Sequence, residues 1–292
     1  MHSLLTTRVP GPLSPTSWRD RWQAQKQALL ATPGYGSPDQ YWNTERNVTD
    51  LYAKSRKKQS WQEKSAAQRE AMTIPDGARV LDIGGGTGTL AIPLAARGCE
   101  VTVVEPSRVM REELAKNIRD AGLESVIVLP CRWEDCNPDD LGDPFETVIA
   151  SYSLAMPDIG TAIGKMQACS RGTVSLFWFL TPPFWSRVSS DLWPFLHGAA
   201  YPGEPLADCL WQVLHEMGIM ARLTIEKKKP SRYLSVDELV RDTFQRLNCT
   251  TPGQEEILRN YFSMILRQDG DGFVYPYDSY SAHLQWSTGH TA

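Results

Sequence analysis

The sequence lacks a strong positive charge and any long apolar run, and each lack excludes a class of protein. It has 30 Lys and Arg residues against 34 Asp and Glu, a formal net charge of −4. A protein that holds duplex nucleic acid mainly through phosphate contacts carries a basic field instead. No stretch is apolar over the roughly 20 residues that a membrane-spanning helix needs. We therefore expect no DNA partner and no membrane association.

Cysteine is also scarce. The six cysteines are scattered, and none has the C-x-x-C spacing of a zinc or redox site. The nearest pair, Cys131 and Cys136, is expected to be structural. The first 18 residues lack the apolar segment of a signal peptide, and prolines interrupt them early. We expect a protein of the reducing cytoplasm with no metal site and no disulfide framework.

The chain changes character near residue 76. Residues 1–75 are polar, with a predicted helix from Trp18 and a second, interrupted one over about 39–71. Their apolar residues are sparse, so we expect an N-terminal helical cap or lid that packs on the main domain. Residues 76–292 are expected to form that domain, with insertions at about 181–206 and 235–270.

From Ala78 onward, short apolar runs alternate with helical segments. The predicted strands are "ARVLDI", "EVTVVE", "SVIVLP", "FETVIAS" and "TVSLFWFL", followed later by "ARLTIEKKK" and "SAHLQWS". The first five are apolar almost throughout, which indicates burial on both faces. This alternation is typical of an α/β protein whose mostly parallel sheet is covered by helices on both faces.

The stretch "VLDIGGGTG" at residues 80–88 joins a strand directly to a glycine-rich turn. Such a turn brings bare backbone close to a ligand, since a Cβ would collide with it or forbid the turn. The dinucleotide fingerprint G-x-G-x-x-G requires glycine where this chain has Thr89, and no lysine follows as in a Walker loop. The carboxylate of Asp82, two residues before the glycines, suits a cationic ligand better than a pyrophosphate.

Asp82, Gly84, Gly86 and Gly88 together form D-x-G-x-G-x-G, and Glu105 ends the next strand in "VTVVEPSRVM". This combination resembles motifs I and II of class I S-adenosylmethionine-dependent methyltransferases. The resemblance is close over about residues 78–179, weaker to 229, and very weak elsewhere. It implies a Rossmann-like, doubly wound, seven-stranded sheet, S-adenosylmethionine as cofactor, and methyl transfer as the reaction.

The resemblance also implies roles for individual residues. Glu105 would bind the ribose diol, while Pro106 and Met110 would sandwich the adenine. The segment after the third strand would meet the adenine edge, although the family's usual Asp is displaced here, and packing in the core is the alternative role for Met110 and Trp133. Ser151 to Leu154 would lie beneath the transferred methyl group. The expected cofactor-binding residues are Asp82, Gly84, Gly85, Gly86, Gly88, Glu105, Pro106, Met110, Arg132, Trp133, Glu134 and Ser151.

No catalytic residue stands out in the sequence. A sulfonium methyl group is already activated, so a general base helps only when the nucleophile carries a proton with a high pKa. His197, in the aromatic insertion, and Tyr152, after the fourth strand, are the two candidates for a direct role. The "N-P-P-Y" type of sequence found in enzymes that methylate the amino groups of DNA bases is absent after that strand.

The acceptor is the least determined part of the function. The first insertion holds five aromatic residues that would wall a pocket for a flat small molecule, or simply pack the insertion onto the core. They are Phe184, Trp185, Trp193, Phe195 and Tyr201. We expect a small-molecule acceptor. The alternatives are a protein or RNA acceptor, an aminopropyl transferase, and a non-catalytic protein that binds S-adenosylmethionine; the sequence leaves the oligomeric state open.

Overall fold

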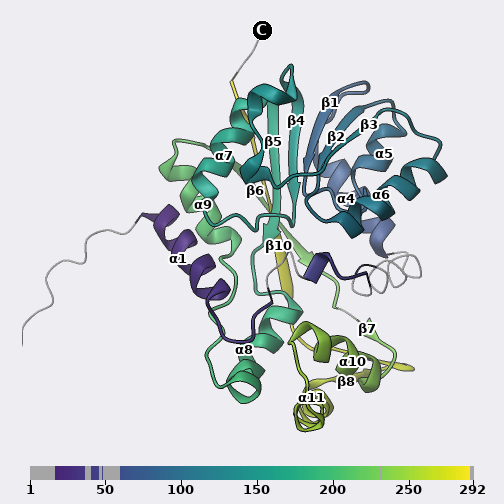
Figure 1. The fold of residues 1–292 in the computed structure, drawn as a ribbon, viewed down its shortest axis with the longest axis vertical. Helices are drawn as coiled ribbons and strands as arrows, with labels where there is room; N and C mark the ends of the chain where they lie inside the picture. The colour runs from purple at the N-terminus through teal and green to yellow at the C-terminus, as the bar shows by residue number, and fades with distance from the viewer. Residues whose placement is uncertain (1–16, 37–40, 46–47, 49–59, 231, 290–292) are drawn as a thin grey trace, which may run out of the picture.

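The computed structural model describes residues 17–36, 41–45, 48, 60–230 and 232–289. At its centre lies a seven-stranded sheet in the order β3-β2-β1-β4-β5-β10-β6 (Figure 1). Only β10 runs antiparallel to its neighbours, β5 and β6. The strands are β1 (Arg79–Ile83), β2 (Glu100–Val104), β3 (Val126–Leu129), β4 (Phe145–Ser151), β5 (Ser170–Phe179), β6 (Arg222–Lys228) and β10 (Ser279–Ser287). The predicted mostly parallel, seven-stranded α/β sheet is confirmed.

The strand order reverses at β1, and this reversal positions the site. β1 pairs in parallel with β2 on one side and with β4 on the other. The chain therefore leaves the carboxyl ends of these strands toward opposite sides, which opens a crevice there in doubly wound sheets. The glycine-rich turn follows β1 at this point.

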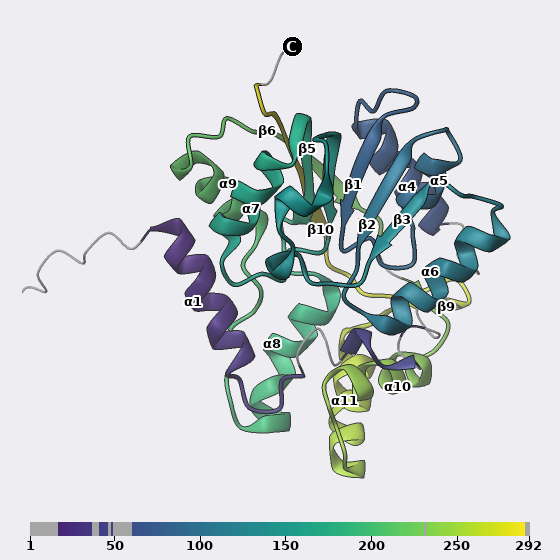
Figure 2. The same ribbon diagram turned by 45° about the horizontal axis from the view of Figure 1, so that its top comes forward.

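Helices cover both faces of the sheet (Figures 1 and 2). α1, α7 and α9 pack together on one face, while α5 and α6 cover the other with α4 beside them. Their bounds are α1 (Trp18–Leu30), α4 (Ser60–Ala71), α5 (Ala91–Ala95), α6 (Arg108–Asp120), α7 (Ile159–Ala168) and α9 (Ala207–Glu216). Two 3₁₀ turns, Trp133–Asp135 and Pro138–Leu141, follow β3. Every helix of the described ranges is too short or too polar to cross a bilayer.

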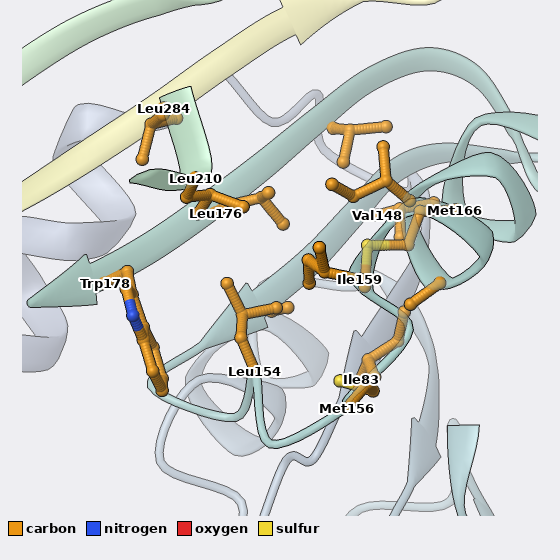
Figure 3. Close-up of a cluster of buried hydrophobic side chains, with 14 of the residues drawn as sticks. Ile83, Val148, Leu154, Met156, Ile159, Met166, Leu176, Trp178, Leu210 and Leu284 are labelled. Atoms are coloured by element: carbon orange, nitrogen blue, oxygen red, sulfur yellow. The ribbon is translucent and has the colours of Figure 1, made fainter. Parts of the chain in front are cut away.

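The strands are apolar on both sides because each side packs against helices. Side chains from β1, β4, β5 and β10 meet those of α7 and α9 in the cluster shown in Figure 3. Ile83, Val148, Leu154, Met156, Ile159, Met166, Leu176, Trp178, Leu210 and Leu284 are labelled there. Fully burying one such aliphatic side chain is worth about 1.5–3 kcal/mol relative to exposure.

α1 belongs to this core, which its sparse apolar content did not predict. Trp22 is fully buried in the same cluster, and its indole N–H donates to the carbonyl of Met156 at 2.9 Å. Lys26, on the next turn, forms a buried ion pair with Glu204, with 2.5 Å between Nζ and Oε2. Ser17 caps α1, since its hydroxyl accepts the N–H of Asp20 at 3.0 Å. Much of the second predicted helix, over 39–71, lies outside the described residues; its last part is α4.

A separate lobe stands below the sheet in Figure 1. It contains α8 (Phe184–His197), α10 (Val236–Arg246), α11 (Pro252–Ile265) and a small antiparallel sheet in the order β7-β9-β8. Those strands are β7 (Arg232–Tyr233), β8 (Arg267–Asp269) and β9 (Gly272–Val274). α8 lies within the first predicted insertion, and α10, α11 and β8 within the second. The lobe has its own core, in which Leu192, Val240, Leu258 and Phe262 are buried.

Candidate functional site

The turn after β1 depends on its glycines for two different reasons. Gly84 and Gly86 have φ values of +68° and +57°, in the left-handed region that favours glycine. A Cβ at Gly84 would collide with the Cβ of Ser153, whereas a Cβ at Gly86 would enter open space. Both glycines line a cavity of about 900 Å³. Gly84 thus lets two chain segments approach closely, and Gly86 leaves room on the cavity side.

The other two predicted glycines are placed differently. Gly85 lines the cavity, and a Cβ there would meet Cγ1 of Val103 at 2.7 Å. Gly88 does not line it: a Cβ at Gly88 would meet Cδ1 of Leu114 at 2.6 Å. The structure therefore corrects the expectation for Gly88, which serves the packing of α5 against α6 and not a ligand.

Glu105 follows β2 and is held against the glycine turn. Its Oε2 accepts the backbone N–H of Gly86 at 2.9 Å, and its Oε1 accepts that of Ser107 at 2.8 Å. The side chain is buried yet lines the cavity. Two backbone donors on separate segments fix the plane of the carboxylate, so its orientation is set before any ligand arrives.

Asp82 lies on the cavity wall beside Glu105. Its side chain is buried, and Oδ2 has no hydrogen-bond partner among the described residues. Burial, and secondarily the charge of Glu105, raise the pKa of Asp82 to about 7. An orphaned buried carboxylate oxygen costs stability unless a donor or cation reaches it. The site therefore fits a cationic group, such as the ammonium at the amino acid end of S-adenosylmethionine.

The segment after Glu105 forms the next part of the wall. Pro106 and Met110 both line the cavity. Ser107 caps α6 by accepting the N–H of Met110 at 3.1 Å, and its hydroxyl donates to the carbonyl of Trp42 at 2.7 Å. Trp42 also lines the cavity and packs beside Met110. No motif in the sequence marks Trp42 or its neighbours.

The residues after β3 line the cavity, but Trp133 is mainly a core residue. Arg132, Trp133 and Glu134 are all on the wall. The indole of Trp133 is only 2% exposed, and its N–H donates to the carbonyl of Ala162 on α7 at 3.0 Å. The packing alternative therefore accounts for most of the Trp133 side chain, with a small edge left at the cavity.

Ser151 and Tyr152 end β4 on the cavity wall. The hydroxyl of Ser151 accepts the amide N–H of Gln68 from α4 at 2.8 Å, a contact that the sequence did not predict. Tyr152 has a φ of +55°, which is unusual for a bulky residue and often accompanies functional sites. Its ring lies 4.9 Å from that of Phe179 on β5.

His197 is placed away from the cavity. It is the last residue of α8, where its Nε2 lies 2.7 Å from the carbonyl oxygen of Leu247 and its ring centroid lies 4.4 Å from that of Trp193, with the two rings tilted. It does not line the cavity. These contacts account for the side chain structurally, so no catalytic role is assigned to it.

The far half of the cavity is formed by the inserted lobe, the N-terminal segment and residues of β5 and β10. Of the five aromatic residues expected to wall a pocket, Phe184 and Trp185 do so. Trp193 and Tyr201 are instead buried in the core of the lobe, and Phe195 is 73% exposed. Lining residues in this half that sequence reasoning missed are Leu30, Tyr41, Phe179, Tyr233, Asp242, Arg246 and Tyr280.

No cluster of three or more His, Cys, Asp or Glu side chains in the described ranges is arranged to hold a metal ion. Beside the glycine turn, the chemistry that the cavity offers comes from backbone amides and two buried carboxylates. A glycine turn beside a fixed carboxylate suits a nucleoside, since the backbone can approach closely and the carboxylate can accept from a ribose diol.

Comparison with known proteins agrees with this geometry. Residues 53–196 match the family model described as a methyltransferase domain. A Haemophilus influenzae protein described as uncharacterized is 35% identical over 107 residues, which are 37% of this chain and 39% of that protein. The match thus spans about two fifths of that relative's length.

Two solved structures share the fold. A Bacillus halodurans C-125 protein assigned as a methyltransferase has a TM-score of 0.55 and 14% identity, covering 77% of this chain and 98% of its own. The YcgJ protein of Bacillus subtilis has a TM-score of 0.53 and 14% identity, covering 76% of this chain and 97% of its own. The fold, the D-x-G-x-G-x-G turn with Glu105, and the matched family model agree, and residues 53–196 belong to a methyltransferase domain of the S-adenosylmethionine-dependent kind.

Proposed function

We propose that the protein transfers the methyl group of S-adenosylmethionine to a small-molecule acceptor held inside the cavity. The observation that carries the proposal is the cavity itself. One end has the glycine turn and Glu105, the other has aromatic rings of the inserted lobe, and the volume is about 900 Å³. Sites for small ligands are concave and mostly apolar, with a few placed polar groups.

The half nearest the glycine turn would hold the cofactor. In this proposal Glu105 accepts from the ribose hydroxyls, Asp82 faces the charged amino acid end, and the backbone of Gly84 to Gly86 runs alongside. Pro106 and Met110 lie on either side of the adenine, whose edge faces residues 132–134. This assignment uses the orientation that Gly86 and Ser107 impose on the Glu105 carboxylate.

Bound S-adenosylmethionine supplies an activated methyl group that is displaced in line by the acceptor's nucleophile. The chain's own contribution is then to position the acceptor and to exclude water. Tyr152 and Phe179 form the floor between the two halves, with Ser151 beside them. We assign no general base, since a nucleophile without a high-pKa proton needs none.

The lobe and the N-terminal segment would act as the cover of this chamber. We propose residues 1–75 as a helical cap and residues 76–292 as the methyltransferase domain, with insertions at about 181–206 and 235–270. Support comes from Tyr41 and Trp42 on one side and Phe184, Trp185 and Arg246 on the other, all of which line the cavity. A covered chamber favours a small acceptor over a nucleic acid or protein chain.

The test is methyl transfer from labelled S-adenosylmethionine to fractions of the source cell. We expect label in the fraction below about 1 kDa, dependent on active protein. Label in RNA or protein fractions instead would contradict the small acceptor but not the methyltransferase activity. Binding of S-adenosylhomocysteine without transfer to any fraction would favour a non-catalytic binding protein.

A further inference from the structure

We propose that Arg246 is a specificity-determining residue whose guanidinium binds a carboxylate on a flat, aromatic acceptor. This inference rests on the proposed function and names the chemistry of its acceptor. Arg246 ends α10, is half-buried, and lines the far half of the cavity. No motif marked it in the sequence.

Arg246 is held in place by neutral aromatic groups. Its guanidinium donates to the Tyr41 hydroxyl at 2.8 Å and lies over the Tyr41 ring, 4.7 Å from the centroid. On its other side the ring of Trp185 is 5.5 Å away. Rings on both sides stabilise the cation and fix the plane of its donor fork. They leave its positive charge uncompensated.

The charge balance of the lining sets Arg246 apart. Lys228 is paired with Glu226, with 2.5 Å between Nζ and Oε2. Arg132 and Lys229 have interactions of their own. The partners of Arg246 are a phenol hydroxyl and two aromatic rings, and no carboxylate of the described residues forms an ion pair with it. A half-buried cation of this kind provides a ready site for an anion.

Two buried tyrosines near the guanidinium do not supply that anion. Burial and the charge of Glu204 raise the pKa of Tyr35 and the pKa of Tyr201, although Arg246 opposes the rise in both. Both phenols are therefore neutral at physiological pH. Neither phenol therefore supplies a negative charge to pair with Arg246.

A continuous aromatic surface leads from the methyl-transfer end to Arg246. The rings of Tyr152 and Phe179 are 4.9 Å apart, and those of Phe179 and Trp185 are 6.3 Å apart and edge-on. Trp185 then contacts Arg246. A flat acceptor lying on these rings, with its nucleophile near Tyr152, would bring an acidic group at its far end to the guanidinium.

The anion is best matched by a carboxylate with a single charge. A guanidinium fork binds a carboxylate through two parallel hydrogen bonds. Asp242, one helical turn before Arg246, lines the same cavity and would repel a second negative charge. A doubly charged phosphate monoester therefore fits less well than a monoanion.

The experiment measures binding of matched aromatic probes to the protein saturated with S-adenosylhomocysteine. The probes are benzoate and 2-naphthoate, their amides, and 2-naphthyl phosphate, and calorimetry gives each affinity. For wild type we expect at least one carboxylate to bind about tenfold more tightly than its amide. Arg246→Gln should remove that preference and leave amide binding unchanged. Arg241→Gln, an exposed arginine on the same helix that does not line the cavity, should retain it.

Each other outcome overturns the proposal. No acid preference in wild type, or a preference that survives in Arg246→Gln, means that Arg246 does not bind the carboxylate. If 2-naphthyl phosphate binds more tightly than 2-naphthoate, the proposed selectivity for a singly charged anion is wrong. Weaker binding of S-adenosylhomocysteine in Arg246→Gln would place the guanidinium at the cofactor's own carboxylate. Failure of wild type to bind S-adenosylhomocysteine at all would instead overturn the proposed function, which keeps the two failures distinct.

Discussion

The two halves of the cavity are built by different means. The cofactor half comes from turns at the carboxyl ends of β1, β2, β3 and β4, where short, local segments carry the functional groups. The far half is assembled from segments as distant in sequence as Tyr41, Trp185 and Arg246. A local strand-turn-helix unit therefore builds the half proposed for the cofactor. Tertiary packing of inserted elements builds the half proposed for the acceptor.

Glu105→Ala should have the largest effect on the cofactor half. Loss of the carboxylate removes the proposed ribose contact and leaves the N–H groups of Gly86 and Ser107 without their acceptor. We expect affinity for S-adenosylhomocysteine to fall by about 100-fold or more, roughly 3 kcal/mol. Calorimetric titration measures it. Glu100→Ala, an exposed acid on the same β2 strand, should bind as wild type; equal loss in both variants would refute the assignment.

Asp82→Asn tests the electrostatics of the cofactor half through the pH dependence of the free energy of unfolding. The folded-state pKa of Asp82 is raised to about 7, so the native protein holds this proton more tightly than the unfolded chain. The associated stability is present below about pH 4 and is lost as the pH rises through 7. Without ligand, wild type should lose about 2–4 kcal/mol of unfolding free energy relative to Asp82→Asn between pH 4 and 8.

Urea unfolding at several pH values measures the free energy of unfolding of wild type and of Asp82→Asn. The difference between the two proteins at each pH isolates the contribution of Asp82. A pH-independent difference would mean that Asp82 titrates normally and is not desolvated. Asp82→Asn should also bind S-adenosylhomocysteine more weakly. The carboxylate that destabilises the ligand-free protein would then be the one that binds the cofactor.

Trp185→Ala probes the far half alone. The ring contacts Phe179 and Arg246 but none of the residues proposed for the cofactor. We expect affinity for S-adenosylhomocysteine to stay within twofold, while methyl transfer to the acceptor falls about tenfold as the chamber loses a wall. Trp211→Ala, a partly exposed tryptophan on α9 that does not line the cavity, is the matched control. A parallel loss of cofactor binding would show that the halves are not separable.

His197→Asn should have the smallest effect on activity. Its ring contacts Leu247 and Trp193 in the lobe and does not reach the cavity. The methyl-transfer rate should remain within about threefold, with a midpoint of thermal unfolding a few degrees lower as the lobe loosens. A rate loss of 100-fold with an unchanged melting temperature would restore His197 as a catalytic candidate.

The sequence predicted the sheet and most of the cofactor half, because both are encoded locally. The apolar strand pattern, the turn glycines and the acid after β2 all lie within about 30 residues. Their spacing is compatible with few other kinds of cofactor site. Gly88 was misassigned because a motif does not tell a ligand contact from a packing contact. Trp22 shows the same limit: one tryptophan on a polar helix carries it into the core.

The far half was beyond sequence reasoning for a physical reason. The cation–ring contacts of Arg246 join α10 to Tyr41, about 200 residues earlier, and to Trp185 on α8. Nothing in the composition of α10 separates Arg246 from Arg241. Composition did predict an aromatic insertion, but only packing decided that Trp185 faces the cavity while Trp193 faces the lobe.

The most direct test of the account is a crystal structure of the complex with S-adenosylhomocysteine. We expect the ribose hydroxyls within hydrogen-bonding distance of the Glu105 carboxylate, the adenine between Pro106 and Met110, and the sulfur facing Tyr152 and Phe179. The space beside Trp185 and Arg246 should remain open for an acceptor. A ligand that fills this space, or that leaves Glu105 without a ribose contact, would contradict it.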